Sequence, residues 1–165
     1  MFFSTNIEKV FEVFAHSPTK GFQLRGISRS TKLGLPTVRN HVHSLEAKGL
    51  IKKVKGNVYD FYQANAGNIA FKAAKRADTL SRILPLQERI IAELNPNAVI
   101  LIGPAALGED TEADPLTLYI EPQRKIDLKK EERLLGRAIH VATDKILPAE
   151  LAKGIILFQK TGGTP

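Results

Sequence analysis

The chain has 165 residues, 43% of them hydrophobic and 25% charged, which suits one sizeable soluble domain or two small ones. It contains no cysteine, so disulfides and thiolate metal sites are excluded, and apolar runs such as 98–102 are far too short to span a bilayer. The net charge of +7 is concentrated in residues 1–65, where ten Lys or Arg face four Asp or Glu, whereas residues 66–165 hold fourteen against thirteen.

The first predicted helix begins at a capping box. Thr5 precedes Glu8 by three residues, so each side chain can accept a hydrogen bond from the backbone N–H of the other. Apolar side chains then recur at helical spacing and are expected to close a core: Phe3, Ile7, Val10, Phe11 and Phe14. Residues 17–21 read as a loop, and Phe22 is expected to anchor a short strand.

Residues 24–49 fit two short helices joined by a turn. A turn at 32–34 lets one set of apolar side chains share a buried side: Leu24, Ile27, Leu33, Val38, Val42 and Leu45. Gly34 is an acceptable N-cap, Pro36 fits the first turn of the second helix, and Gly49 ends that helix. The pattern therefore predicts a helix-turn-helix.

The opposite face of the second helix carries the candidate DNA-binding side chains. They can contact base edges or phosphates from a helix in a major groove, and they are Pro36, Thr37, Arg39, Asn40 and His43. His41 is expected to flank the core. Because His41 and His43 are two positions apart, they point to different faces of the helix, and we expect no metal site there.

A basic hairpin is predicted next, with strands at 50–54 and 58–62 around a turn at 55–57. Lys53 and Lys55 lie near its tip, where they can neutralise phosphates or reach a minor groove, although such charges also protect exposed hairpin edges. Helix-turn-helix and hairpin together predict a winged helix. The coincidence of positive charge with this geometry favours double-stranded DNA over the alternatives, a solvated basic surface or an anionic membrane face.

A long helix is predicted over Ile69–Leu94, with two apolar stripes on either side of Pro85. The proline is expected to kink or split this helix, because it removes one backbone hydrogen bond and clashes with the preceding turn. Such a segment can serve as a spacer, as part of a second core or as a dimerisation helix. Since winged-helix proteins usually read DNA as symmetric dimers, we expect a homodimer.

The remaining residues alternate between strands and helices. Strands are predicted at 98–102, 116–120, 138–143 and 155–158, and helices at 105–107, 126–135 (ending at Gly136) and 148–152. Residues 108–114 form an acidic loop that is expected to be solvated, and the tail from 160 is expected to be loose. The overall expectation is an α+β chain: a winged helix-turn-helix at 1–64, a helical linker at 65–95 and a small mixed-sheet α/β domain at 96–165.

The run AVILIGPAALGEDTEADPLTLYI resembles the signature of the nucleotidyltransferase superfamily of the polymerase-beta and kanamycin-nucleotidyltransferase type. That signature is a strand, a Gly-Ser step, a helical turn with a further glycine, a loop, and an Asp-x-Asp pair entering the next strand. Gly103 and Gly108 match its glycines. The N-terminal half is similar to archaeal-type winged-helix regulators, which are found fused to such a domain. The resemblance implies a nucleotidyltransferase-like fold for residues 96–165.

The sequence departs from this family at its catalytic positions. The Ser of the Gly-Ser step is Pro104, which has neither a hydroxyl nor an N–H. The Asp-x-Asp positions fall on Pro115 and Thr117, and a slip of one residue recovers Asp114 but no second carboxylate. His140 replaces a third carboxylate. Because the family holds its magnesium ions with these acids, the comparison implies a degenerate, inactive domain, with no catalytic residue, metal or cofactor.

The favoured function is therefore a cytoplasmic, DNA-binding transcriptional regulator that is not an enzyme. Its C-terminal domain would serve for dimerisation or for sensing a small-molecule effector of unknown identity. The cytoplasm is expected because the opening residues turn polar at once and lack the apolar region of a secretory leader. No membrane association is expected, because the apolar runs are too short to span a bilayer. Two alternatives stay open: an active or antitoxin-type nucleotidyltransferase, and an adaptor that binds protein or RNA.

Overall fold

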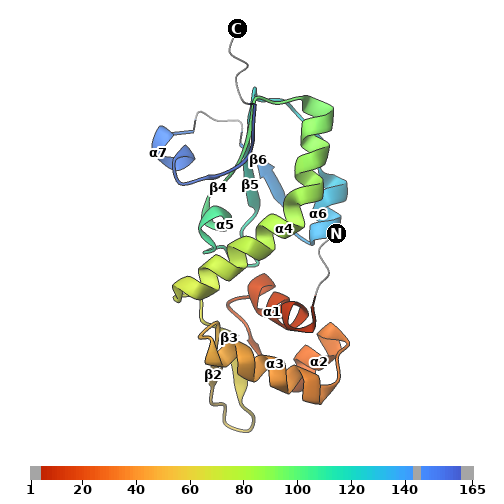
Figure 1. Ribbon diagram of the computed structural model, residues 1–165, viewed down its shortest axis with the longest axis vertical. Helices are drawn as coiled ribbons and strands as arrows, with labels where there is room; N and C mark the ends of the chain where they lie inside the picture. The colour runs from red at the N-terminus through yellow and green to blue at the C-terminus, as the bar shows by residue number, and fades with distance from the viewer. Residues whose placement is uncertain (1–4, 143–145, 161–165) are drawn as a thin grey trace. The chain divides into compact units, whose positions relative to one another are not determined.

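A computed structural model describes residues 5–142 and 146–160 and has the expected α+β class (Figure 1). The chain divides into two compact units, Met1–Asp78 and Thr79–Pro165, each with its own hydrophobic core. The division falls inside helix α4 (Ile69–Leu94), which contributes side chains to both cores. The division into residues 1–64, a helical linker at 65–95 and residues 96–165 stays a prediction.

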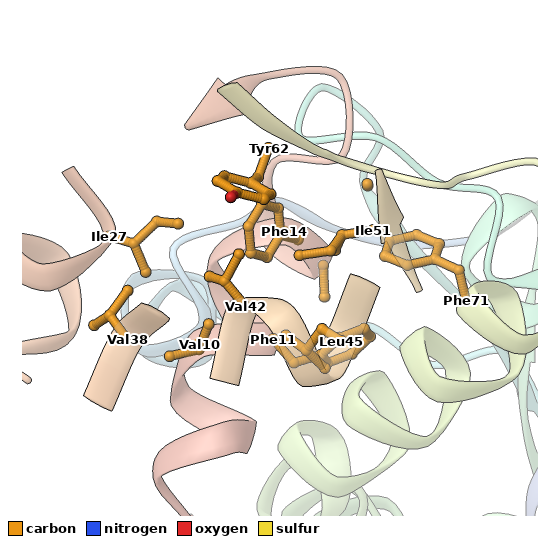
Figure 2. Close-up of a cluster of buried hydrophobic side chains, with 12 residues drawn as sticks. Val10, Phe11, Phe14, Ile27, Val38, Val42, Leu45, Ile51, Tyr62 and Phe71 are labelled. Carbon is orange, nitrogen blue, oxygen red and sulfur yellow. The ribbon is translucent and has the colours of Figure 1, made fainter. Parts of the chain in front are cut away.

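The first unit combines helices with an antiparallel sheet. Its elements are α1 (Asn6–His16), β1 (Gly21–Phe22), α2 (Leu24–Thr31), α3 (Leu35–Ala47), β2 (Ile51–Val54), β3 (Phe61–Ala64) and the beginning of α4. β3 is the central strand, with β1 on one side and β2 on the other. Side chains from α1, α3, α4 and the sheet converge in its core, among them Phe14, Val42, Ile51, Tyr62 and Phe71 (Figure 2).

The predicted capping box is present at the start of α1. Glu8 N donates to Thr5 Oγ1 at 3.4 Å, and Thr5 N donates to Glu8 Oε2 at 2.6 Å. Two free N–H groups of the first turn thereby find acceptors, which fixes where the helix begins. From the same helix, Phe14 meets Phe22 edge to face with ring centroids 5.6 Å apart, which anchors β1 as expected.

The predicted turn between α2 and α3 is confirmed. Lys32 adopts a left-handed conformation (φ 57°) that ends α2, and Ser28 Oγ donates to the carbonyl oxygen of Leu33 at 2.6 Å. Gly34 is the N-cap of α3, with proline in its first turn. The turn thus gives the two helices a shared buried side, from which Ile27, Val38, Val42 and Leu45 enter the core.

The hairpin differs from its prediction. Ile51 pairs with Ala64 and Val54 pairs with Phe61, so residues 55–60 form a longer loop than expected and residues 58–60 are not part of a strand. With the shorter turn, Asp60 would share a strand face with Tyr62, which is buried. The longer loop leaves Asp60 in solvent and avoids burying its charge.

We expect a kink or a split at Pro85, and the structure has no split there, because α4 is continuous from Ile69 to Leu94. Pro85 itself is exposed, whereas the next residue, Leu86, is buried. Packing of Ile83, Leu86 and Ile90 in the second core holds the helix together across the missing hydrogen bond.

The second unit is a mixed sheet with helices. It contains β4 (Ala98–Ile102), α5 (Pro104–Leu107), β5 (Leu116–Glu121), α6 (Lys129–Leu135), β6 (Ile139–Val141), α7 (Pro148–Leu151) and β7 (Ile155–Gln159). The strand order is β6-β5-β4-β7, in which β5 and β6 are parallel and the other pairs antiparallel. The inward face of β4 and β5 packs on α4 through Val99, Leu101, Leu118 and Ile120.

The order of predicted elements in this unit is confirmed, with shorter ends in places. Helix α6 begins at Lys129 rather than 126, because the Asp127 carboxylate accepts the Lys129 N–H at 3.0 Å and leaves the preceding residues outside the helix. Gly136 ends α6 in a left-handed conformation, as expected. Thr143, predicted as the end of β6, and the predicted tail at 161–165 lie outside the described residues.

Candidate nucleic-acid interface

Helix α3 has one buried and one exposed face. Val38, Val42 and Leu45 are buried, because their spacing turns them toward α1 and the sheet. The opposite side exposes four of the five candidate residues, Pro36, Arg39, Asn40 and His43, while Thr37 is half-buried. His41, expected to flank the core, is also half-buried. The exposed side of the helix therefore carries the polar side chains of Arg39, Asn40 and His43.

All the basic side chains of residues 5–65 are exposed. They are Lys9, Lys20, Arg25, Arg29, Lys32, Arg39, Lys48, Lys52, Lys53 and Lys55. Arg25, Arg29 and Lys32 lie on α2 and at its end, beside α3, and they are not among the predicted DNA-binding residues. The sequence alone could have indicated them, because they are basic residues within the predicted helix-turn-helix and their spacing keeps them off the apolar stripe.

Lys53 differs from the other lysines of the hairpin. Its Nζ lies 2.7 Å from Asp60 Oδ2, across the base of the hairpin loop. The hydrogen bond to Asp60 raises the pKa of Lys53 above its ordinary value. Among the described residues, neither Lys52 nor Lys55 has a carboxylate partner, so these two present the less compensated charges.

In the second unit, the structure brings three of the candidate degenerate-site residues together. Thr117 on β5 pairs with Ile102 at the end of β4 and with His140 on β6. Gly103 follows β4 with φ 76°, and a Cβ there would lie 3.9 Å from Thr117 Oγ1. Pro104 begins α5. Gly103, Thr117 and His140 thus occupy one end of the sheet.

Asp114 and Pro115 take another role at this end of the sheet. The Asp114 carboxylate accepts hydrogen bonds from Thr111 N at 2.7 Å and from Thr111 Oγ1 at 2.8 Å, so it closes the loop that precedes β5. Pro115 is exposed between this loop and the strand. The Asp114 carboxylate is thus turned toward the backbone N–H and the hydroxyl of Thr111 in its own loop.

The acidic loop at 108–114 is not simply solvated, which corrects the prediction. Asp110 is buried, with a side chain only 1% exposed, and its Oδ2 lies 2.5 Å from Arg137 Nη1. Arg137 Nε also donates to the carbonyl oxygen of Asp114 at 2.6 Å. Because Asp110 and Arg137 are 27 positions apart in the chain, no local pattern in the sequence indicates this ion pair.

The donor set of the described residues is poor in metal ligands. Within 5–142 and 146–160, no group of three or more His, Asp or Glu side chains is arranged to hold a metal ion. Thr117 and His140 offer a hydroxyl and an imidazole, and neither supplies the negative charge that offsets a triphosphate and its magnesium ions. This end of the sheet can donate and accept hydrogen bonds.

No helix in the part of the chain that the structure describes has both the length and the apolar character needed to cross a bilayer. Comparison with protein-family models, with curated proteins and with solved structures found no match for this chain.

Proposed function

We propose that the chain is a sequence-specific, DNA-binding transcriptional regulator. In this proposal the first unit is a winged helix-turn-helix, with α3 as the recognition helix and the β2–β3 hairpin as the wing. The observation that carries the proposal is the exposed row of Arg39, Asn40 and His43 on a helix whose other face is fixed in the core. Such a helix can enter a major groove without losing its packing.

The chemistry of the row suits base recognition. An arginine can bind O6 and N7 of guanine with two hydrogen bonds, and an asparagine can do the same with N6 and N7 of adenine. Thr37 lies in the first turn of α3, where free backbone N–H groups favour a phosphate, whereas Pro36 beside it has no N–H. We therefore assign base reading to Arg39, Asn40 and His43, and positioning on the backbone to the beginning of the helix.

The surrounding positive charge supports a duplex partner. Arg25, Arg29 and Lys32 flank α3 on one side, and the hairpin presents Lys52 and Lys55. Each lysine or arginine that meets a phosphate releases counterions, so this arrangement suits binding that weakens as salt rises. A basic surface that is merely solvated would not require its lysines and arginines to lie beside the polar face of α3.

For the second unit we propose a nucleotidyltransferase-like domain that has lost catalysis. Thr117 and His140 stand where the resemblance calls for acids, and the Asp114 carboxylate is held by Thr111. The domain would serve for dimerisation or for sensing a small molecule. A homodimer would present two copies of α3 to the two halves of a symmetric operator.

Footprinting on fragments of the source genome, followed by affinity measurements at several salt concentrations, tests the proposal. We expect protected sites, with log Kd rising linearly with log salt at a slope of about 0.9 for each phosphate contacted. The Arg39→Ala/Asn40→Ala double variant should no longer protect these DNA sites. Absence of any protected site together with a flat salt dependence would falsify DNA binding, and a stoichiometric protein or RNA partner would then favour the adaptor.

A further inference from the structure

The loop between β2 and β3 exposes two large apolar side chains at its tip. Val58 is 78% exposed and Tyr59 is 66% exposed, and neither belongs to the core of the first unit. In Figure 1 this loop extends beyond the helices of the unit. Two adjacent large apolar side chains exposed on a protruding loop indicate a surface that a binding partner covers.

The loop has a defined shape. A Cβ on Gly56 would lie 2.2 Å from the carbonyl oxygen of Tyr59 and 2.7 Å from a ring carbon of Phe61, so the chain folds back tightly on this glycine. At the base of the loop, Lys53 and Asp60 form their ion pair. These contacts hold the backbone that carries Val58 and Tyr59, which lowers the entropy lost when the tip is bound.

The charge around the tip identifies the class of partner. Lys55 is exposed in the same loop, Lys52 is exposed on the strand that leads to it, and the acid of this segment, Asp60, is engaged by Lys53. The tip is therefore apolar with a positive margin. A DNA minor groove offers the matching surface, because it has phosphates at both rims and sugar and base edges between which apolar side chains can wedge.

We propose that Val58 and Tyr59 form a wedge that enters a minor groove and bends the duplex there. This inference rests on the proposed DNA-binding function and adds a second, apolar contact to it. Helix α3 packs against β2 within one unit, so a duplex held by α3 in its major groove has its neighbouring minor groove within reach of the hairpin. Partial unstacking at the wedge would favour flexible pyrimidine–purine steps at positions that α3 does not read.

The test uses the full chain and the Val58→Ala/Tyr59→Ala variant on a footprinted duplex of about 30 base pairs, labelled at both ends for energy transfer. Leu134→Ala is the matched control, because it also removes an exposed large apolar side chain, 76% exposed, but from α6 in the second unit. Removing exposed side chains leaves both cores intact, so all three proteins should melt at the same temperature.

We expect the double variant to lose about tenfold in affinity and most of the bend, while the salt slope stays unchanged, because no charge is removed. A minor-groove ligand such as netropsin should weaken DNA binding by the wild type more than DNA binding by the double variant. Gly56→Ala should reproduce the loss of bend by displacing Tyr59. The control should behave as the wild type.

Three results would overturn the wedge. One is a double variant that binds and bends the duplex like the wild type, in which case DNA binding stands without the wedge. Another is a double variant whose affinity falls more for a single-stranded oligonucleotide than for the duplex, which would assign Tyr59 to stacking on unpaired bases. If the wild type binds no duplex at all, the proposed function and the wedge fall together.

Discussion

Arg39 and Asn40 are adjacent residues on α3, and both are exposed while Val38 beside them is buried. If these two side chains read base edges, replacing either with alanine should cost about 1–3 kcal/mol on the preferred site and much less on unrelated DNA. Competition between specific and random duplexes measures this. Lys48→Ala, at the far end of the helix, is the control and should keep the preference.

The hairpin lysines should differ among themselves. Lys55→Ala should weaken binding to all sequences alike and reduce the salt slope by about one, because it removes one phosphate contact. Lys53→Ala should have a smaller effect, since that ammonium lies 2.7 Å from the Asp60 carboxylate and is partly neutralised by it. Salt titrations of the two variants decide this. An equal loss in both would mean that the Lys53–Asp60 pair opens on DNA.

At the scale of elements, the buried pair of Asp110 and Arg137 joins the loop before β5 to the segment before β6. Arg137→Met should cost about 3 kcal/mol, because it leaves a buried carboxylate without its guanidinium. For a chain of this size that corresponds to a fall of about 6–12 °C in melting temperature. The exposed Arg133→Met, on α6, is the control. Thermal unfolding followed by circular dichroism measures this. Equal melting temperatures for the two variants would contradict the prediction.

Helix α4 is joined to α6 by Arg89, whose Nη1 lies 2.5 Å from Glu131 Oε2. This hydrogen bond lowers the pKa of Glu131 from its ordinary value of 4.5. Because the folded pKa lies below the unfolded one, the pair stabilises the fold above about pH 4.5, and that contribution is lost as pH falls through the folded pKa.

The wild type should therefore lose more melting temperature between pH 5 and pH 3 (about the range over which a carboxyl titrates) than Glu131→Gln does. Glu88→Gln changes an exposed acid on α4 and serves as the control. Parallel pH profiles for wild type and Glu131→Gln would show that the contact with Arg89 contributes nothing to stability in solution.

At the scale of the whole molecule, we expect no nucleotidyl transfer. Incubation with labelled ATP, magnesium and candidate acceptors should give no labelled product above a blank, because Thr117 and His140 supply no negative charge to offset the triphosphate. Label transfer that Asp114→Asn abolishes would revive the active nucleotidyltransferase. Label transfer that Asp114→Asn leaves intact would point to contamination.

Part of the first unit could be predicted from local sequence. The capping box at Thr5, the turn around Lys32 and the buried stripe of α3 depend on residues close in sequence, and the structure has all three. The hairpin loop was predicted too short, because the register of Val54 with Phe61 depends on where Tyr62 and Asp60 are placed relative to the core.

By itself, the sequence determined the order of the elements, the helix boundaries at caps and glycines, and the concentration of charge in residues 1–65, since these depend on local chemistry. Only the tertiary structure decided which acids are buried, that α4 stays continuous at Pro85, and that Val58 and Tyr59 stand in solvent. Those outcomes depend on pairing between segments far apart in the chain, where the free energy of packing outweighs local preference.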